Sequence, residues 1–323
     1  MYMNSLEARA YINELSNKKQ AFVFIVDYAM KHAHVWRVAD IPNDVLVSFP
    51  HFSNAPQFIP SKHISLESIP ISKSEYAKSF WCVQSHIQKG NSFLVNLTAE
   101  SKIVTEASLF DIFSSAYAPY KLLFKNDFVV FSPEPFISIY KNCIRTFPMK
   151  GTIDAYIPDA KEQILSNKKE QAEHATIVDL LRNDLSLVAH NVQVTNYRYV
   201  EQINTQSHAL LQVSSSIEGV LNHDIQNKLG DVIFSMLPAG SISGAPKLKT
   251  LEIISEAETY SRGFYTGVMG YFDGENMESA VMIRFIEQKN GSLYYKSGGG
   301  ITSQSSIDEE YSELIQKIYV PIH

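Results

Sequence analysis

Consecutive strand patterns joined by short turns constrain the fold of this chain more than any other feature. One run covers residues 122–148 and turns at Asn126-Asp127 and near Lys141-Asn142, residue types that reverse the backbone between strands. A second run covers residues 265–297, with a turn at Asp273-Gly274. Strands joined by short turns pair antiparallel, whereas a parallel sheet needs a crossover after each strand. With helical patterns inserted between these runs, the sequence predicts a mixed α+β fold.

Hydrophobic periodicity places the other elements. Helical spacing over residues 74–89 is set by Tyr76, Phe80, Val83 and Ile87, and Gly90 is expected to end that helix. The remaining predicted helices are 1–20, 109–117, a helical stretch over 159–190, two helices around 238–246, and 307–319. The remaining predicted strands are 22–26, 34–38, 92–98, 192–199 and 211–217, with 265–272, 279–288 and 292–297 in the second run, the last two joined by a turn at Asn290-Gly291.

Composition excludes several functional classes. With 323 residues and 45% hydrophobic content, the chain can bury a large core, and we expect one domain over residues 1–323. A formal net charge of −6 with mixed signs indicates no nucleic-acid partner and no polybasic membrane surface. The apolar run 21–26 is too short for a membrane span of about 20 residues, so a soluble, cytoplasmic protein is expected. Cys82 and Cys143 form no CxxC pair, and we expect reduced, inert thiols.

One amine and one carboxyl group flank an extended segment. Lys150 stands between a predicted strand and a Gly151-Thr152 turn, and Glu134 precedes it in Ser132-Pro133-Glu134-Pro135-Phe136. A nucleophilic lysine beside an acid suits a reaction in which a hydroxyl leaves while a nucleophile adds. The alternative interpretation is that both residues are ordinary solvated side chains.

Two helical segments each carry a pair of glutamates three positions apart, Glu170 with Glu173 and Glu310 with Glu313. This spacing sets each pair on one helical face, where like charges repel. If the pairs share a cleft, four carboxylates require a hard divalent cation, and Mg²⁺ suits oxygen ligands better than zinc does. Two solvated helix faces are the alternative.

Glycines and isolated cations complete the candidate set. Gly298-Gly299-Gly300 follows a strand, where bare amides could approach an anion, or where the chain makes only a tight turn. The segment 238–247 lacks a Walker A ending, although its amides before Pro246 could face a carboxylate. Arg284 stands in an apolar strand and Lys317 one helical turn beyond Glu313; the alternatives are a solvent-facing arginine and a simple i,i+4 ion pair.

Taken together, the ordered segments resemble the chorismate-utilising enzymes. The segments are Ser132-Pro133-Glu134, Pro148-Met149-Lys150-Gly151-Thr152, EQAEHATIVDLLRNDL from Glu170 to Leu185, PAGSISGAPK from Pro238 to Lys247, RGFYTGVMG from Arg262 to Gly270, Ile283-Arg284, and Gly298 through Lys317. The resemblance spans about residues 90–320 and implies two stacked antiparallel β-sheets with helices on the outside. It also implies a shortened amino-terminal portion compared with typical members.

Within this family, the Pro-x-Lys-Gly-Thr form is similar to the aminodeoxychorismate synthase component I branch, also called para-aminobenzoate synthase component I. That resemblance implies that Lys150 attacks C2 of chorismate while Glu134 protonates the departing C4 hydroxyl. Ammonia then adds at C4 and the lysine leaves, giving 4-amino-4-deoxychorismate, a precursor in folate biosynthesis. Such a transferase would take ammonia from a separate glutamine amidotransferase subunit, because neither cysteine of this chain lies in a glutaminase nucleophile turn.

The resemblance also assigns the other residues. Glu173 and Glu313 match the main Mg²⁺ ligands, and Glu170 and Glu310 support them directly or through water. Positions around the substrate match Gly151, Thr152, Ser243, Tyr265, Arg284, Gly298, Gly299 and Lys317. Gln212 stands where anthranilate synthases commonly have histidine.

Some positions depart from the family pattern. Leu94 stands where water-adding members have a lysine base and aminating members often have glutamine, and Pro135 stands where arginine is usual. Two other functions therefore remain open: anthranilate synthase component I, which would also eliminate pyruvate, and a catalytically idle chorismate-binding partner.

Overall fold

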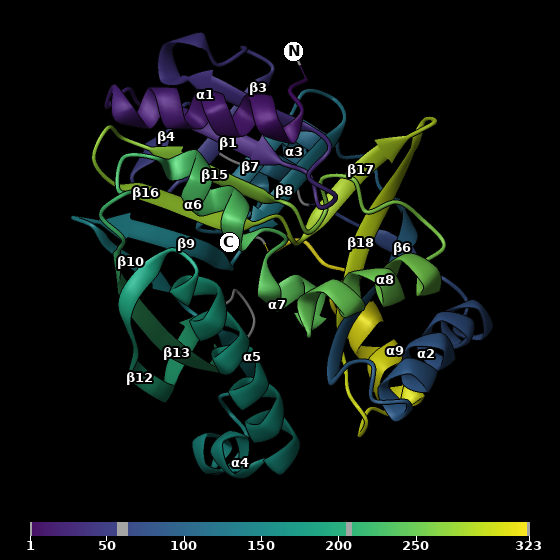
Figure 1. The fold of residues 1–323 in the computed structure, drawn as a ribbon. Coiled ribbons are helices and arrows are strands. Elements are labelled where there is room, and N and C mark those ends of the chain that lie inside the picture. Colours follow the sequence, from purple (N-terminus) through teal and green to yellow (C-terminus); the bar gives the residue numbers. More distant parts are fainter. Residues whose placement is uncertain (1, 57–63, 205–208, 322–323) are drawn as a thin grey trace. The chain divides into compact units, whose positions relative to one another are not determined.

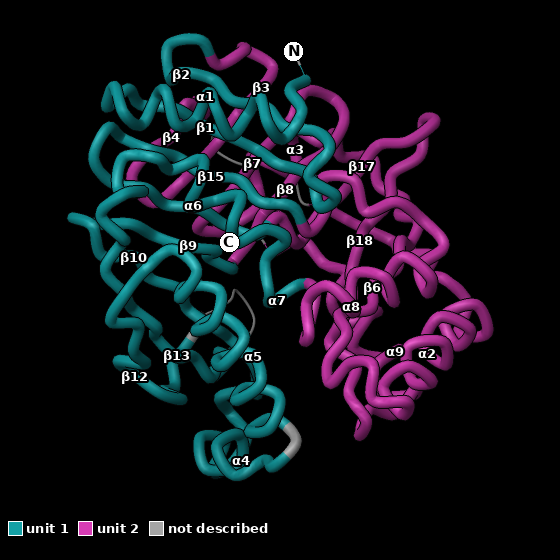
Figure 2. The backbone as a smooth tube through the Cα atoms, viewed as in Figure 1, with its two compact units in different colours: residues 1–40, 134–242, 267–281 teal, residues 41–133, 243–266, 282–323 magenta. Residues whose placement is uncertain are grey.

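The chain is divided into two compact units, each assembled from three stretches of sequence (Figure 2). Unit 1 comprises residues 1–40, 134–242 and 267–281, and unit 2 comprises residues 41–133, 243–266 and 282–323. This computed structural model describes residues 2–56, 64–204 and 209–321. Because the chain alternates between the units, neither is one continuous segment of sequence.

Unit 1 contains an antiparallel sheet of nine strands in its described residues, in the order β11-β13-β10-β9-β16-β15-β1-β2, with β12 also paired to β13 (Figure 1). The strands are β1 Phe22–Val26, β2 Ala33–Arg37, β9 Pro135–Tyr140, β10 Cys143–Thr146, β11 Met149–Asp154, β12 Ala189–Asn204, β13 Ala209–Leu221, β15 Val268–Phe272 and β16 Met277–Val281. All five residues of β1 are buried, as expected for a central strand with β15 and β2 on its two edges.

The helices of unit 1 are α1 Ser5–Asn17, the short 3-10 helix η1 Val38–Asp40, α4 Ala160–Ser166, α5 Lys168–Ser186, α6 Leu229–Met236 and α7 Gly240–Ser243, whose last residue is assigned to unit 2. A capping box starts α1, because the Asn4 side chain accepts from the Glu7 amide and the Glu7 side chain accepts from the Asn4 amide. Helix α1 packs against α6, and α5 packs against β11, β12 and β13. The helix with the first glutamate pair therefore lies against the strand that carries Lys150.

Unit 2 has a second antiparallel sheet of nine strands among the described residues, in the order β14-β6-β18-β17-β8-β7-β3-β4, with β5 paired to β6. The strands are β3 Val45–Phe49, β4 Phe52–Ser53, β5 Glu67–Ile69, β6 Leu94–Val104, β7 Tyr120–Phe124, β8 Phe128–Ser132, β14 Gly244–Ala245, β17 Phe285–Lys289 and β18 Ser292–Ile301. The longest ladder joins β6 to β18 and places Gly298 opposite Thr98 and Gly299 opposite Leu97.

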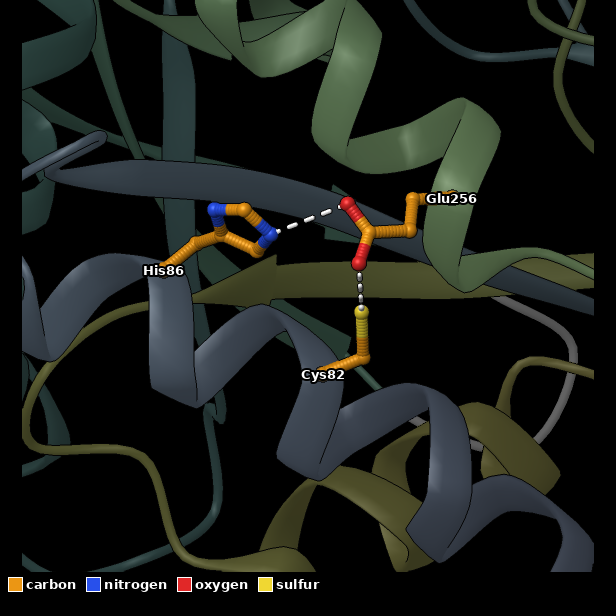
Figure 3. Close-up of side chains that lie close together, drawn as sticks. All are labelled: Cys82, His86 and Glu256. Atoms are coloured by element: carbon orange, nitrogen blue, oxygen red, sulfur yellow. Dashed lines mark hydrogen bonds and ion pairs between the residues drawn. The ribbon is translucent and has the colours of Figure 1, made fainter.

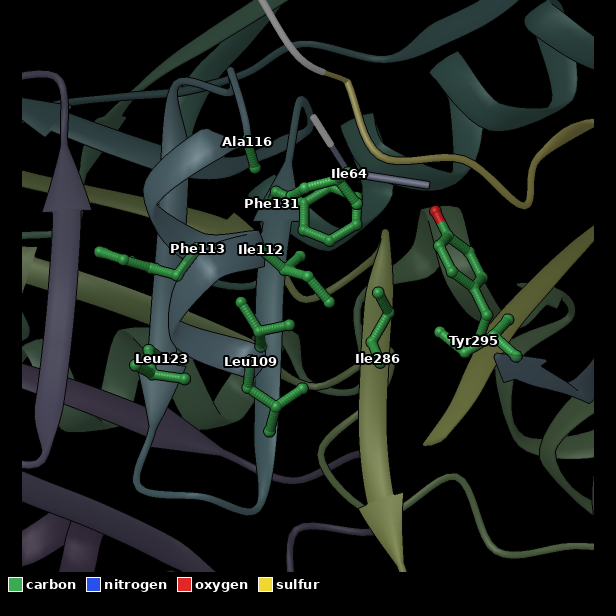
Figure 4. Packing of buried hydrophobic residues seen from close by; sticks show 11 residues of the cluster. Ile64, Leu109, Ile112, Phe113, Ala116, Leu123, Phe131, Ile286 and Tyr295 are labelled. Carbon is green, nitrogen blue, oxygen red and sulfur yellow. The ribbon is translucent and has the colours of Figure 1, made fainter. Parts of the chain in front are cut away.

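The helices of unit 2 are α2 Lys73–Gln88, α3 Leu109–Ser115, α8 Lys247–Ala257 and α9 Ile307–Gln316. Helix α2 contacts both α8 and α9, and α9 also packs against β18. A cluster of buried apolar side chains joins α3 to β7, β8, β17 and β18, and includes Leu109, Ile112, Phe131, Ile286 and Tyr295 (Figure 4). This core fixes the sheet that contains Gly298-Gly299-Gly300. The expectation that these glycines follow a strand or form a tight turn is wrong, because they lie within β18 and pair with β6.

The predicted α+β class and antiparallel strand pairing are confirmed. The helix predicted over residues 74–89 is α2, which ends at Gln88, and Gly90 has a φ of 74°. The helical stretch 159–190 is two helices, because Asn167 ends α4 and caps α5 through its side chain. The short strands β3, β4 and β5 were not predicted.

One predicted strand is wrong. Residues 279–288 were expected as a single strand, but β16 ends at Val281 in the first sheet and β17 begins at Phe285 in the second. Arg284 lies at the break with a φ of 52°, which an interior strand residue does not adopt. Both strands are buried, so the apolar run continues across the break. Hydrophobicity alone therefore does not predict that the strand ends there.

Candidate functional site

Lys150 lies in strand β11, at an irregularity of its ladder. The register of β11 against β13 shifts between Met149 and Thr152, and Gly151 has a φ of 90°. The turn predicted at Gly151-Thr152 is therefore a bulge within a strand, and bulges re-aim the neighbouring side chains. Glycine is required here because its φ lies in the left-handed region. Thr152 pairs with Gln212 across the ladder and is exposed.

Helix α5 presents its two glutamates to this bulge. Nζ of Lys150 lies 2.8 Å from Oε2 of Glu173, whose side chain is only 5% exposed. A Cβ added at Gly151 would lie 3.1 Å from Oε2 of Glu170, so the absence of a side chain there leaves room for that carboxylate. The structure thus brings together Lys150, Gly151, Glu170 and Glu173 in unit 1.

A histidine that the sequence did not single out lies next to this pair on α5. His174 is fully buried, and its Nε2 lies 2.7 Å from Oγ of Ser215. Burial, followed by the positive charges of Arg198 and Lys150, lowers the pKa of His174 to about 4, against the opposing effect of a hydrogen bond with the Lys150 backbone. The imidazole is therefore neutral near pH 7 and adds no charge beside the amine.

Glu134 lies between β8 and β9 and is held by a residue of α7. Oγ of Ser241 donates to Oε1 of Glu134 at 2.6 Å, and the Val281 amide donates to the Glu134 carbonyl oxygen at 3.1 Å. Ser241 belongs to the segment 238–247 that was considered for anion binding, so that segment positions the predicted acid within unit 1.

In unit 2, the second glutamate pair lies beside the glycines of β18. A Cβ added at Gly299 would lie 3.1 Å from Oε1 of Glu313 and 3.5 Å from Oε2 of Glu310. Nζ of Lys317 lies 2.6 Å from Oε1 of Glu313 and donates to the Gly298 carbonyl oxygen at 2.8 Å. The i,i+4 pair considered for Lys317 is therefore formed, and the same amine also holds the glycine strand.

Glu310 is the more buried member of that pair. Its side chain is 4% exposed, and Oε1 accepts from Oγ of Ser305 at 2.6 Å. Ser305 lies in the turn before α9 and was not predicted as a site residue, because a serine before a helix is ordinarily interpreted as a cap.

Arg284 and Tyr265 lie in a tyrosine-rich part of unit 2. Burial disfavours the charge of Arg284, but the hydroxyl groups of Tyr295, Tyr319 and Tyr265 raise the pKa of its guanidinium. Its Cζ lies 5.0 Å from the centre of the Tyr319 ring, a cation–π distance. The solvent-facing alternative for Arg284 is wrong, and the residue stands at the strand break. Tyr265 and Ser243 are both buried, at 4% and 0% exposure.

The donor chemistry of the four glutamates fits a hard divalent cation. Each unit holds two of them on one helix, and their ligand atoms are carboxylate oxygens, the donors that Mg²⁺ prefers. One glutamate in each pair is balanced by a lysine, Glu173 by Lys150 and Glu313 by Lys317. Glu170 and Glu310, the other members, lie close to the glycines of the neighbouring strand.

Comparison with known proteins decides the family. A family model described as chorismate binding enzyme matches residues 11–323. The chain belongs to the chorismate-binding enzymes. The match extends well before the first recognised motif near residue 90, so the amino-terminal strands and the second half of α1 are also part of the family pattern.

Two curated relatives illustrate the range of similarity. An uncharacterised PabA-like protein of Pasteurella multocida is 47% identical over 313 residues, covering 96% of this chain and 97% of the relative. Aminodeoxychorismate synthase component 1 of Klebsiella aerogenes is 32% identical over 269 residues, covering 78% of this chain and 58% of that protein. The predicted likeness to aminodeoxychorismate synthase component I is thereby confirmed as a likeness.

Solved structures confirm the predicted chorismate-utilising fold. The menaquinone-specific isochorismate synthase of Escherichia coli superposes with a TM-score of 0.76 at 16% identity, covering 98% of this chain and 82% of that one. Anthranilate synthase component I of Streptococcus pneumoniae superposes with a TM-score of 0.67 at 28% identity, covering 81% and 60%. None of the helices in the described ranges is long and apolar enough to cross a membrane.

Proposed function

We propose that this chain aminates chorismate at C4 to give 4-amino-4-deoxychorismate, in an Mg²⁺-dependent reaction that passes through a covalent adduct on Lys150. The observation that carries the proposal is the position of the Lys150 amine, which lies on a strand bulge at 2.8 Å from the buried carboxylate of Glu173. The motif around Lys150 is similar to the aminating branch, and a relative named aminodeoxychorismate synthase component 1 is 32% identical.

Lys150 must lose a proton before it can attack, because a free lysine titrates near 10.4. The contact with Glu173 favours the ammonium form, so this contact must break as the substrate binds. Mg²⁺, when bound by the glutamates, would supply positive charge that disfavours the ammonium and would hold a substrate carboxylate. His174 is neutral near pH 7, so only Lys150 and Glu173 change their charge or ion pairing as the substrate binds.

The bond changes then balance within this chain. The Lys150 nitrogen bonds to C2 of chorismate, the C1–C2 double bond moves to C1–C6, the C5–C6 double bond moves to C4–C5, and the C4 hydroxyl leaves as water with a proton from Glu134. Ammonia then bonds to C4, the double bonds return to C5–C6 and C1–C2, and the Lys150 amine is released. Glu134 is suited to its role because the Ser241 hydroxyl donates to its carboxyl group and fixes the position of that group.

The remaining predicted residues take supporting roles in this proposal. Glu170, Glu173, Glu310 and Glu313 bind Mg²⁺, and Gly151, Thr152, Ser243, Tyr265, Arg284, Gly298, Gly299 and Lys317 bind chorismate. Ammonia comes from a separate glutamine amidotransferase subunit, consistent with the PabA-like name of the 47% identical relative. The product would serve para-aminobenzoate and folate synthesis in the cytoplasm.

The test is chorismate consumption with ammonium and Mg²⁺, with products separated by chromatography. Lys150→Ala should abolish amination, and Lys161→Ala, an exposed lysine of α4, is the matched control. Intact mass after trapping should show an adduct in the parent and none in Lys150→Ala. Full activity of Lys150→Ala would remove the covalent route.

Anthranilate synthase activity is the second candidate, because an anthranilate synthase component I of known structure is 28% identical. Anthranilate is fluorescent and forms directly if pyruvate is eliminated, so fluorescence that develops without a further enzyme would favour it. The idle binding partner would show saturable chorismate binding with no turnover by any nucleophile and no adduct on Lys150.

A further inference from the structure

A thiol, an imidazole and a carboxylate meet on the helices α2 and α8 of unit 2, and none of the three residues is assigned a role above. Cys82 and His86 are four residues apart on α2 and so share one helical face, which packs against α8 and Glu256. Their ligand atoms all lie within 4.8 Å of one another, and among the described residues this is the group of three that could hold a metal ion. Figure 3 shows both α2 side chains directed toward Glu256.

The distances are close to the edges of a tetrahedral site. Sγ of Cys82 lies 3.7 Å from Oε1 of Glu256, and Nε2 of His86 lies 3.1 Å from Oε2 of the same carboxylate. Zinc bonds of 2.0–2.3 Å at a tetrahedral angle separate sulfur from oxygen by about 3.5 Å and nitrogen from oxygen by about 3.3 Å. Because the two contacts end on different oxygens, the Glu256 carboxylate must turn so that one oxygen faces both the thiol and the imidazole when an ion binds.

The ligand types select the metal. One thiolate and one carboxylate neutralise a divalent ion, and a neutral imidazole completes a donor set of sulfur, nitrogen and oxygen that suits Zn²⁺ and not Mg²⁺. The site is open to solvent, because the Glu256 side chain is 62% exposed and that of His86 is 18% exposed. Water or an external ligand can fill the fourth position.

A second contact orients the imidazole. Nδ2 of Asn91 lies 3.0 Å from Nδ1 of His86, and rotation of this amide lets its oxygen accept from a protonated Nδ1. That tautomer leaves Nε2 with a lone pair directed at the cluster, the arrangement that metal-binding histidines ordinarily have. The Asn91 amide therefore serves the ion-free and the ion-bound tautomer alike.

The two helices are also held in register near the site. Oγ of Ser92, which follows α2, lies 2.9 Å from Oγ1 of Thr250 on α8 and donates to the Ala245 carbonyl oxygen at 2.8 Å. The ligands are thus carried by elements that are already fixed, which reduces the ordering that a metal must impose.

We propose that Cys82, His86 and Glu256 form a Zn²⁺ site that clamps α2 to α8. The bound ion replaces the thiol proton of Cys82, which passes to solvent, and the Nε2 hydrogen bond of His86. The alternative is that these side chains form only a surface hydrogen bond and ion pair between two helices.

The test measures Zn²⁺ binding to the reduced full-length chain, without a polyhistidine tag and with excess Mg²⁺ present to occupy the glutamates. Competition against a chromogenic chelator should show one equivalent of Zn²⁺ bound by the parent. Cys82→Ser, His86→Gln and Glu256→Gln should each weaken binding at least tenfold. Cys143→Ser is the matched control, because Cys143 lies in unit 1 beside Glu218 and no histidine completes that pair among the described residues; it should leave the affinity unchanged.

Two further measurements test the Zn²⁺ site even if one of these variants folds poorly. Co²⁺ bound to the parent should show a thiolate-to-cobalt charge-transfer band that Cys82→Ser lacks. Asn91→Ala should weaken Zn²⁺ binding about tenfold, because His86 then loses the amide that orients its ring. Circular dichroism of each metal-free variant checks its folding. The proposal is overturned if the parent binds no Zn²⁺ in excess of the variants, or if the cobalt band survives in Cys82→Ser.

Discussion

A buried ion pair in unit 2 fixes strand β6, which pairs with the glycines of β18. Removal of this ion pair should strongly destabilise the fold. Arg262 donates to Glu258 through Nε at 2.8 Å and through Nη2 at 2.6 Å, and the two side chains are 2% and 3% exposed. Nη2 of Arg262 also donates to the Asn96 carbonyl oxygen at 2.7 Å, and Glu258 accepts from the amide and hydroxyl of Thr98 at 2.8 and 2.7 Å. The pair therefore fixes β6 on both sides of Leu97, the residue opposite Gly299.

The expected magnitude follows from burial. Arg262→Met leaves the Glu258 carboxylate with its two Thr98 donors but without a counter-ion in these contacts, and removal of one partner of a buried pair costs about 3–5 kcal/mol. An exposed pair gives the contrast. Arg182 lies 2.8 Å from Asp179 with side chains 43% and 64% exposed, and Arg182→Met should cost about 0–1 kcal/mol.

Urea denaturation followed by circular dichroism measures both variants at one pH and salt concentration. For 323 residues, an unfolding entropy of about 0.7 kcal/mol/K converts a loss of about 4 kcal/mol into a fall in Tm of about 6 °C. The double variant Glu258→Gln/Arg262→Met should cost less than the sum of the two single changes, since it leaves no unpaired buried charge. A loss for Arg262→Met no larger than that for Arg182→Met would refute the reasoning.

Three further predictions concern unit 1. Gly230→Ala should lower the free energy of unfolding by about 1–3 kcal/mol, because the added Cβ would lie 2.1 Å from the Arg9 carbonyl oxygen of α1. Thermal melting measures this loss of stability, and an unchanged Tm would mean that α1 and α6 can separate at no cost. Burial lowers the pKa of His174 to about 4 in the folded chain, so the unfolded chain binds this proton more readily. The free energy of unfolding should therefore fall by up to about 3 kcal/mol as the pH falls from about 6.5 to about 4. His174→Gln should flatten that part of the stability profile, and an unchanged profile would assign the pH dependence to other groups. Ser241→Ala removes the donor to Glu134 and should lower kcat for amination about tenfold with little change in KM; a change confined to KM would show that Ser241 acts in substrate binding instead.

Local patterns carried the parts of the fold that could be predicted. The turns at Asp273-Gly274 and Asn290-Gly291 and the helix from Lys73 to Gln88 depend on nearest neighbours in sequence, and all three are present. At Arg284 the chain passes from the first sheet to the second. Which sheet a strand joins depends on the partner strands available for pairing, and these come from distant parts of the sequence. A continuous apolar run cannot reveal it.

The candidate site likewise contains residues that the sequence predicts and contacts that it does not predict. Glutamates three apart on one helix are visible in the sequence, and α5 and α9 place them beside Gly151 and Gly299 as that spacing allows. The contact between Ser241 and Glu134 spans 107 positions, and that between His86 and Glu256 spans 170. Cys82 was expected to be inert because it forms no CxxC pair, and nothing in the sequence indicates that its thiol lies beside Glu256 of α8 and within 4.8 Å of the ligand atom of His86.

The two glutamate pairs are built on one local plan, and the difference between them concerns the lysine. In each unit, a helix sets two carboxylates against a strand glycine whose missing side chain leaves space, and one lysine amine lies within 2.8 Å of a carboxylate oxygen. Such lysines offset the repulsion between the glutamates of each helix, so both helices can fold before any cation binds. Lys317 is on the same helix as Glu313 and is also held by the Gly298 carbonyl oxygen, which fixes it as a counter-ion. Lys150 instead extends from the bulged strand β11, so its ion pair with Glu173 joins a strand to helix α5.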